Sequence, residues 1–405
     1  MENKTIKIII GALILVTLLF LGFVFYVSRP VSEQDDEGGK TEITFPETGD
    51  NAGTRRSSSS RSRIGSISSQ KENRLTQLTQ ESVSGAAFYG TTTALYMERA
   101  TGHIYKISLK GEEKIRLSNT TIPKSFEAFW SPKSDNLVVR YFDDPPQGQI
   151  KLRVKTFLIS AGHLLKATTT GEVKGVATPS SISEITVSPS EDKIFYLNRL
   201  EDSVEGIVAD FSNKNQKKIF ELAFGEFNLH WPAKDQIFLL TKPSSRTEGY
   251  LYSLDQRTGA LARVLGGIKG MTALVSPAGD KVVFSQTANN VLESGVYDAK
   301  EKNFSKLGFA TLADKCVWSG KGQQTGKFLY CAVPDGAVSS DLPDGWYQGA
   351  VSFSDSVWSK NLATGETKKI FDTPRLDVVD PQLSADESYL IFTNKNDGTL
   401  WSLRL

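Results

Sequence analysis

The feature that most constrains the fold of this chain is a hairpin that recurs seven times. In each copy a short apolar strand leads into a tight polar turn and then into a second, more hydrophobic strand. The copies span residues 87–99, 128–141, 185–197, 229–240, 273–285, 316–332 and 382–394, and the first of them is degenerate. Such regular recurrence is typical of a repeat architecture rather than of an irregular globular domain.

The spacing of the copies identifies the kind of repeat. Aligned on the turn serine, or on Trp231 in one copy, the anchors lie 57, 43, 45, 43 and 65 residues apart. A period near 43 with four strands per unit predicts an all-β, seven-bladed β-propeller with four-stranded antiparallel blades over residues 72–405. The last unit ends one strand short at Leu405. We therefore expect a strand from residues 73–80 to complete it and to close the ring.

The hairpins carry a resemblance. The segments WSPKSDNLVV, VSPSEDKIFYL and VSPAGDKVVF resemble the SPDGK-type hairpin of the TolB-type, WD-like bacterial propeller repeats. This similarity at the level of the repeat covers roughly residues 73–405 and implies the propeller fold. It does not imply a function, because propellers serve many. The serine, proline and aspartate of each hairpin are expected to be structural turn residues.

The N-terminus predicts a membrane anchor. Residues 8–27 are uncharged and apolar apart from Thr17, and about 20 helical residues span the hydrocarbon of a bilayer. Lys4 and Lys7 precede this stretch and acidic residues follow it, so residues 1–7 are expected in the cytoplasm. The alternative is a cleaved signal peptide, which has a shorter apolar region. The prediction is a single-pass protein of the bacterial cytoplasmic membrane with the propeller outside, periplasmic or extracellular.

Residues 28–71 are expected to be a disordered tether. They are poor in apolar residues and rich in Ser, Gly, Glu and Arg, so they bury too little surface to offset the entropy of ordering. Their charges are segregated, since an acidic part precedes the arginine-rich TRRSSSSRSR. The basic part either contacts anionic lipid or polymer, or is a solvated spacer.

Cys316 and Cys331, the only cysteines, fall on the two strands of one predicted hairpin. A disulfide is compatible with strand neighbours in an oxidising compartment, and two buried free thiols are the alternative. Two cysteines without nearby histidines do not make a metal site.

Catalytic signatures are sparse. The three histidines, His103, His163 and His230, do not fall in a recognisable catalytic or metal-binding motif, and no phosphate- or dinucleotide-binding loop occurs. We therefore expect no catalytic residues, no metal and no cofactor. A net charge of +1 gives no indication of nucleic acid as a partner.

Two acidic insertions break the repeat between the second and third strands of a unit, one in the second blade and one in the sixth. Because these loops leave a propeller on one face, both are expected to rim the same surface. The candidate binding residues are Asp143, Asp144, Asp335, Asp341, Asp344, Trp346 and Tyr347. They are suited to a basic peptide, a sugar or a cation. The alternative is that Trp346 and Tyr347 fold back to hold a long loop in place while the aspartates are merely solvated.

The sequence thus predicts a non-catalytic binding or scaffold module for a protein, peptide or cell-envelope polymer, which docks on the face of these loops. An envelope enzyme of the hydrolase or lyase type, with its site on the same face, is one alternative. A purely structural surface protein is the other.

Overall fold

The computed structural model describes residues 74–144, 153–223, 225–288, 291–320, 322–336 and 341–405. The predicted cytoplasmic segment 1–7, membrane span 8–27 and tether 28–71 lie outside these residues. Among the described residues, no helix is both long and apolar enough to cross a membrane.

Seven four-stranded antiparallel sheets make up the propeller, as the repeat predicted. The first three blades, each given from its inner to its outer strand, are β2 (Val83–Tyr89), β3 (Thr93–Glu98), β4 (Ile104–Ser108) and β5 (Lys114–Arg116); β6 (Ser125–Trp130), β7 (Asn136–Asp143), β8 (Arg153–Ser160) and β9 (Lys174–Ala177); and β10 (Ile182–Val187), β11 (Lys193–Arg199), β12 (Val204–Asp210) and β13 (Lys217–Leu222). A short helix, α2 (Gly162–Lys166), joins β8 to β9.

Blades 4 to 6 follow the same order. They are β14 (Phe227–Ala233), β15 (Gln236–Thr241), β16 (Glu248–Asp255) and β17 (Leu261–Lys269); β18 (Thr272–Val275), β19 (Lys281–Ala288), β20 (Val291–Asp298) and β21 (Asn303–Lys306); and β22 (Cys316–Trp318), β23 (Phe328–Pro334), β24 (Asp355–Asn361) and β25 (Thr367–Asp372). Three short helical segments accompany blade 6: η1 (Ala313–Lys315), η2 (Gly322–Gln324) and α3 (Asp344–Tyr347).

The seventh blade closes the ring with the N-terminal strand. It consists of β26 (Val378–Leu383), β27 (Tyr389–Asn394), β28 (Leu400–Arg404) and, outermost, β1 (Leu75–Gln77). Leu75 lies opposite Leu403 in the antiparallel register. The prediction that residues 73–80 supply the missing outer strand is confirmed, and the pairing protects an edge that would otherwise be open.

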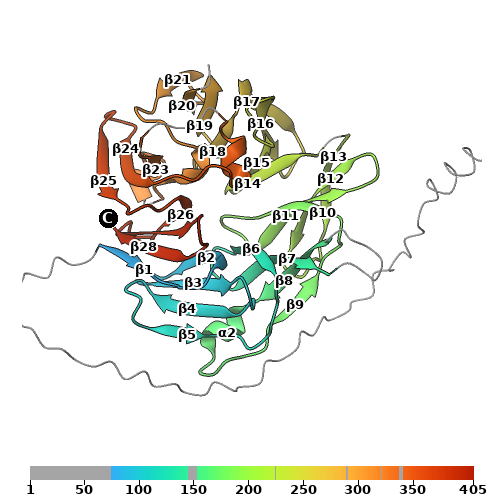
Figure 1. Ribbon diagram of the computed structural model, residues 1–405. Helices are drawn as coiled ribbons and strands as arrows, with labels where there is room; N and C mark the ends of the chain where they lie inside the picture. The colour runs from blue at the N-terminus through green and yellow to red at the C-terminus, as the bar shows by residue number, and fades with distance from the viewer. Residues whose placement is uncertain (1–73, 145–152, 224, 289–290, 321, 337–340) are drawn as a thin grey trace, which may run out of the picture. The chain divides into compact units, whose positions relative to one another are not determined.

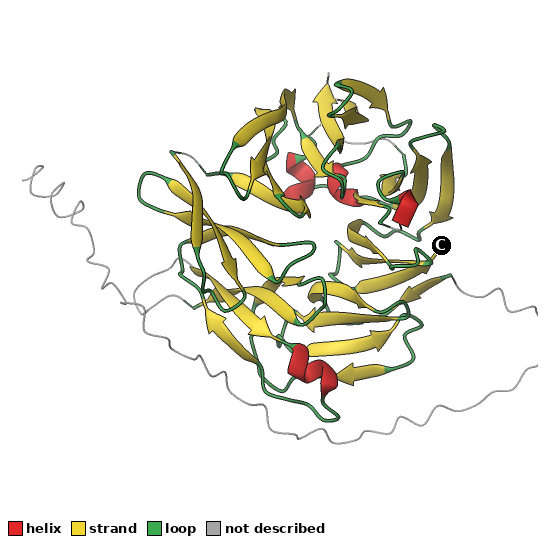
Figure 2. Ribbon diagram, turned by 180° about the vertical axis from the view of Figure 1, so that it is seen from behind, coloured by secondary structure: helices red, strands yellow, loops and turns green. Residues whose placement is uncertain are grey.

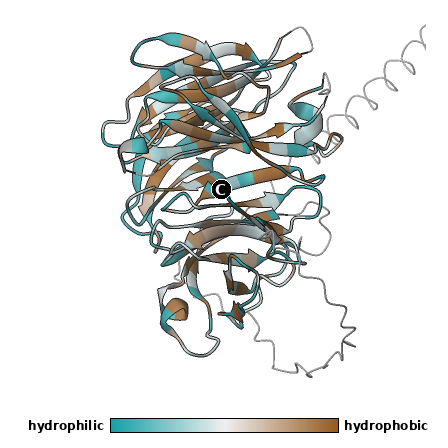
Figure 3. Cartoon of the chain, turned by 90° about the vertical axis from the view of Figure 1, so that its left-hand side faces the viewer, coloured by the Kyte–Doolittle hydropathy of each residue, from teal (hydrophilic) through white to brown (hydrophobic). Residues whose placement is uncertain are grey.

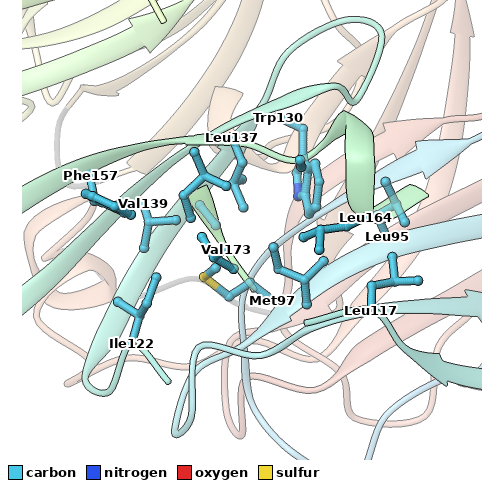
Figure 4. Close-up of a cluster of buried hydrophobic side chains, with 14 of the residues drawn as sticks. Leu95, Met97, Leu117, Ile122, Trp130, Leu137, Val139, Phe157, Leu164 and Val173 are labelled. Atoms are coloured by element: carbon cyan, nitrogen blue, oxygen red, sulfur yellow. The ribbon is translucent and has the colours of Figure 1, made fainter. Parts of the chain in front are cut away.

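The core lies between the blades. Seven clusters of buried apolar side chains each join two neighbouring blades, and one of them joins blade 7 to blade 1. Figure 4 shows the cluster between blades 1 and 2, where Met97 and Leu95 meet Leu137 and Val139, and Leu164 of α2 adds to the contact. Each sheet buries both faces in this way, which is why the hydrophobic run of each second strand is nearly continuous.

In a β-propeller the inner strands surround a central channel, and β2, β6, β10, β14, β18 and β26 are seen around the centre of the ring in Figure 1. Strands and turns account for nearly all of the described chain, with few helical turns (Figure 2). Hydrophilic residues gather in the turns while hydrophobic ones follow the strands (Figure 3).

The repeated turn serine holds the hairpin together. The Oγ of Ser131 accepts the backbone N–H of Asn136 at 3.1 Å, and that of Ser276 accepts the N–H of Lys281 at 3.0 Å. Ser384 makes the same bond to Tyr389 at 3.0 Å. These serines are buried, so each hydroxyl accepts the hydrogen bond that the turn amide would otherwise donate to water. The structural interpretation of the turn residues is confirmed.

The two cysteines lie directly opposite each other on β22 and β23. Their sulfur atoms are 2.06 Å apart and form a disulfide.

Candidate functional site

The candidate site is built around the described residues 335–336 and 341–354 of the insertion between the second and third strands of blade 6, which we call the blade 6 insertion. It lies on the face of the ring that carries the connections between second and third strands, here called the loop face. Asp344 accepts the backbone N–H of Ser245 from blade 4 at 2.6 Å, and the carbonyl of Leu342 accepts the hydroxyl of Thr287 from blade 5 at 2.5 Å. The insertion is therefore fixed to blades other than its own.

An apolar cluster holds the insertion against the ring. Trp346 is only 3% exposed and packs with Leu342 and Phe353 of the insertion and with Leu292 and Leu312 of the ring. Burial of a tryptophan removes a large apolar area from water and accounts for much of the stability of such a loop.

Below this cluster lies a group of fully buried charges, Lys315, Asp355 and Asp377, which we call the Lys315 cluster. Each side chain is 0% exposed. The Lys315 ammonium lies 2.6 Å from Asp377 and 2.9 Å from Asp355, and it also donates to the carbonyl of Val378. All three of its donor hydrogens thus have acceptors, which a buried ammonium requires.

The Lys315 cluster also binds the insertion. The indole N–H of Trp346 donates to both carboxylate oxygens of Asp377 at 3.1 Å, and the backbone N–H of Phe353 donates to the same group at 3.0 Å. The ammonium of Lys315 lies 5.0 Å from the centroid of the Trp346 ring, and that of Lys395 lies 5.1 Å from it. Hydrogen bonds and cation–π contacts therefore act together on one tryptophan.

Asp355 differs from Asp377 within the cluster. One of its oxygens accepts from Lys315 and from the backbone N–H of Val378 at 2.7 Å, while the other is buried without a hydrogen-bond partner among the described residues. Burial raises the pKa of Asp355 to about 6, although the Lys315 ammonium opposes this effect.

Above the cluster, Tyr347 and Asp314 are exposed together. Tyr347 is 40% exposed, and its hydroxyl donates to Asp314 at 2.9 Å. Asp314 belongs to η1, immediately before the inner strand β22. Protein surrounds both groups and leaves them only a confined contact with water, and this burial raises the pKa of each. The negative charge of Asp314 raises that of Tyr347 further.

Asp380 lies on β26, the inner strand of blade 7. Its side chain is exposed, and burial by the surrounding walls raises its pKa to about 6, with the charges of Asp314 and Glu127 adding to the effect. Glu127 lies on β6 of blade 2, so its influence crosses the channel. Asp380 has a positive φ of 50° at an irregularity in the pairing of β26, a conformation that aspartate adopts more readily than most residues.

Cations neutralise the carboxylates of blades 2 and 3. Arg140 lies 2.8 Å from Glu127, and Lys242 forms an ion pair with Glu184 of β10. By contrast, in the part of the chain that the structure describes, neither Asp314 nor Asp380 takes part in an ion pair. Two exposed carboxylates therefore remain available at the mouth of the channel on the side of blades 6 and 7.

The structure brings only some of the predicted site residues together. Asp341, Asp344, Trp346 and Tyr347 share the blade 6 insertion, and Asp335, at its start, accepts the hydroxyl of Ser356 at 2.7 Å. Asp143 and Asp144 lie on blade 2, where Lys155 is 3.1 Å from Asp143 and Lys124 pairs with Asp144.

Trp346, one of the candidate binding residues, does not stand free on the loop face. Its indole is buried and bonded to Asp377, so it is not open to a partner in this structure. The alternative, in which Trp346 holds the loop in place, describes what is observed. Sequence reasoning missed Lys315, Asp355, Asp377, Asp314 and Asp380. Four of them lie in or next to a connection into a strand and Asp380 lies within β26, and at such positions a charged residue normally indicates only exposure to solvent.

The histidines do not form a site. His103 is buried near Thr121, His163 bonds the carbonyl of Glu172, and burial lowers the pKa of His230 to about 4. Among the described residues, no group of three histidine, cysteine or acidic side chains is arranged to hold a metal ion.

Comparisons with known proteins give the fold alone. No family model and no curated protein matches the chain. An oligogalacturonate lyase solved in complex with manganese is 13% identical with a TM-score of 0.54, covering 82% of this chain and 93% of its own. An oligogalacturonate lyase from Vibrio parahaemolyticus is 9% identical with a TM-score of 0.55, covering 91% and 98%. The likeness supports the propeller and leaves the resemblance to TolB-type repeats one of sequence pattern.

Proposed function

We propose that this chain is a non-catalytic binding module, anchored in the membrane with its propeller outside the cytoplasm, whose loop face binds a cationic group of a protein or envelope-polymer partner. The observation that carries the proposal is the pair of exposed carboxylates, Asp314 and Asp380, at the mouth of the channel. Tyr347 adds an aromatic face beside them.

The electrostatics of this pair favour a cation. Both carboxyl groups have a raised pKa because the surrounding protein restricts their contact with water. The negative charge of Asp314 raises the pKa of Asp380 further. A bound ammonium or guanidinium group relieves that repulsion and forms charge-assisted hydrogen bonds. The blade 6 insertion holds Tyr347 on a fixed support, which limits the entropy lost on binding.

The test is calorimetric titration of the protein with a hexalysine peptide. We expect binding that weakens with added NaCl and that falls at least tenfold in Asp380→Asn and in Asp314→Asn. Binding also weakens as the pH falls through about 6, because the raised pKa of Asp380 makes that carboxylate protonate there. Asp143→Asn serves as the matched control, since that carboxylate already pairs with Lys155. Hexalysine affinity that is unchanged in both variants excludes this site.

The alternative function is an enzyme acting on the loop face, and the oligogalacturonate lyases among the structural neighbours favour it. The two functions make opposite predictions about charge, because oligogalacturonate is a polyanion and the mouth of the channel is acidic. Incubation with oligogalacturonate, followed by chromatography of the products, separates them. Shortened products that disappear in Asp380→Asn would replace the binding proposal with a lyase or hydrolase. A protein inactive toward both probes would fit the purely structural alternative.

The membrane part of the proposal rests on the apolar stretch 8–27 and on Lys4 and Lys7 before it. It places the protein in the bacterial cytoplasmic membrane. Protease added to spheroplasts is expected to cut residues 28–71 and to release the propeller. Cleavage only after lysis would reverse the orientation.

A further inference from the structure

The Lys315 cluster holds an amine and two carboxyl groups out of contact with water, and the proposed function makes no use of them. Lys315, Asp355 and Asp377 are each fully buried. Two aromatic rings, those of Trp346 and Phe353, lie with their centroids 5.0 and 5.1 Å from the Lys315 ammonium. Burial of charged groups is costly and gives little net stability over an apolar core, so stability alone is a weak explanation for this arrangement.

The side-chain nitrogen of Lys315 lies beside the carboxyl carbon of Asp377. The nitrogen is 2.6 Å from Oδ1 of Asp377, and a carbon–oxygen bond is about 1.2 Å long, so the nitrogen is at most about 3.8 Å from the carbon. Atoms that react with each other are well placed at about 3–3.5 Å. A small movement of either side chain therefore brings the nitrogen to a reacting distance from the carbon.

The second oxygen of Asp377 is surrounded by hydrogen-bond donors. Oδ2 accepts the indole N–H of Trp346 at 3.1 Å and the backbone N–H of Phe353 at 3.0 Å, and the hydroxyl of Ser352 is 3.4 Å away. When a nucleophile adds to a carboxyl carbon, negative charge develops on such an oxygen, and fixed donors stabilise it as an oxyanion hole does. Asp377 is therefore the carboxyl group whose surroundings favour attack.

Asp355 has the surroundings of a group that carries protons. Its Oδ2 accepts the Lys315 ammonium at 2.9 Å and the backbone N–H of Val378 at 2.7 Å. Its Oδ1 is buried and has no hydrogen-bond partner among the described residues, so a lone pair is available for a proton. Burial raises the pKa of Asp355 to about 6, and the negative charge of Asp377 adds to this effect. A carboxyl group of this kind in contact with an amine can accept its proton and pass it on.

We propose that the side chains of Lys315 and Asp377 join in an isopeptide bond, which the chain forms by itself with Asp355 as the proton carrier. Asp355 first moves one proton from the ammonium to Oδ1 of Asp377, which leaves a neutral amine beside a neutral carboxylic acid. The nitrogen then bonds to Cγ of Asp377, while Oδ2 carries the negative charge toward its N–H donors. Asp355 moves a second proton from the nitrogen to the Oδ1 hydroxyl, the bond between Cγ and Oδ1 breaks, and water leaves.

The reaction balances without an oxidant, a reductant or a cofactor. The ammonium contributes two hydrogens and Asp377 contributes one oxygen to the water that leaves, and Asp355 ends as it began. The third hydrogen stays on the amide nitrogen, where the carbonyl of Val378, 2.8 Å from Nζ, can accept it. Burial favours the product, because one neutral amide replaces two buried charges.

The bond would connect two blades. Lys315 directly precedes β22, the inner strand of blade 6, and Asp377 directly precedes β26, the inner strand of blade 7. The two residues are 62 positions apart in the sequence, and a cross-link over such a length constrains the unfolded chain. Because the Cys316–Cys331 disulfide already fixes β22 to β23, the amide would extend the covalent connection from blade 6 to the blade that closes the ring.

Mass spectrometry of a tryptic digest tests the proposal. The full chain is purified in detergent, denatured, reduced to open the disulfide and digested. Trypsin does not cleave after an amidated lysine, so the wild type should yield one branched species that joins residues 307–321 to residues 376–395. Its mass should be lower than the sum of the two peptides by one water molecule. Fragmentation of this species should place the link at Lys315 and Asp377.

Two variants and a control define the roles of the residues. Lys315→Arg keeps a cation but should give no branched species. Asp355→Asn keeps the shape of the side chain, and the branched species should form at least about a hundredfold more slowly without the proton carrier. The matched control is Lys281→Arg, because Lys281 pairs with Asp298 at 2.9 Å at a partly exposed site. This control should give the branched species as the wild type does.

Two results with the wild type alone would overturn the inference, whether or not a variant folds. Separate peptides 307–315 and 376–395 at their full masses, from a protein that unfolds cooperatively, mean that the Lys315 cluster is held by ionic contacts only. Loss of water confined to the peptide 376–395 means that an aspartate has cyclised on its own backbone instead. Neither result depends on hexalysine binding, so this inference and the proposed function fail separately.

Discussion

The loops between the second and third strands of blades 2 and 6 are both acidic but have different roles. Asp143 and Asp144 of blade 2 are exposed to varying degree and pair with Lys155 and Lys124 near the edge of their own blade. In blade 6, Asp344 receives a backbone N–H from blade 4, and its neighbour Trp346 is buried. Acidic composition alone does not separate the two.

The difference arises from the apolar residues inside the loop. The blade 6 insertion includes Leu342, Trp346 and Phe353, which leave water together, whereas the described ends of the blade 2 loop offer mainly charged groups. Burying apolar area offsets the entropy of ordering a long loop, and salt bridges at the surface do not. Loops that look alike by charge are therefore better compared by their apolar content.

The largest effect is expected from Lys315→Met. This change leaves the two fully buried carboxylates, Asp355 and Asp377, without their cation. Removing one partner of a buried ion group typically costs about 3–5 kcal/mol in unfolding free energy, and urea denaturation measures it. Lys155→Met, which removes a partly exposed partner of Asp143 in blade 2, is the matched control and should cost under about 1 kcal/mol. Equal losses of unfolding free energy in the two variants would show that burial does not distinguish the ion pairs of the two blades.

The next effect is expected from Trp346→Ala. We expect a loss of about 3 kcal/mol, because the change empties a packed site and removes the N–H that Asp377 accepts. Trp346→Phe keeps most of the apolar contact and should cost only about 1–2 kcal/mol for the lost hydrogen bonds. Thermal unfolding of the two variants checks the order. A melting temperature unchanged in Trp346→Ala would mean that the insertion does not contribute to the stability of the ring.

These two residues show where sequence reasoning succeeds and where it stops. The blades, their four strands and the closure by β1 follow from a repeat with alternating apolar residues, which is a local signal. The Lys315 cluster depends on three residues that are 22 to 62 positions apart, from the pairs 355–377 and 315–377. Only the closed ring brings them together, and no local pattern distinguishes a buried lysine from an exposed one.

The same limit applies to the channel mouth. Asp314 and Asp380 stand on different blades, and each follows an apolar segment that predicts no more than a strand or its connection. That the loops rim one face was predictable from blade geometry, while the choice between an exposed and a buried Trp346 depended on packing across four blades.

A third effect concerns the pH dependence of stability. Burial raises the pKa of Asp355 from 3.8 to about 6, so between these values the folded state keeps a proton that the unfolded chain releases. The stability from this group is present below about pH 4 and is lost as the pH rises to about 6, a difference of about 3 kcal/mol. We expect the unfolding free energy of the wild type, relative to Asp355→Asn, to decrease over this window.

Asp386 provides the opposite case. Hydrogen bonds from Ser384 and Ser388 lower its pKa to about 2, so its contribution is present above about pH 4 and is lost as the pH falls toward 2. The difference between wild type and Asp386→Asn should therefore have the reverse slope. Parallel profiles for the two variants would contradict the assignment of Asp355 as the proton-binding member of the Lys315 cluster.

The smallest effect is expected on blade 2. Asp143→Asn and Asp144→Asn each remove a carboxylate whose partner is at least one-third exposed. Solvent and salt screen such pairs, so the unfolding free energy should change by less than about 1 kcal/mol, and the change should shrink further in 0.5 M NaCl. Urea denaturation at two salt concentrations measures both. A loss above about 2 kcal/mol that persists in salt would mean that packing holds the blade 2 loop as it holds the blade 6 insertion. The contrast between the two loops would then be wrong.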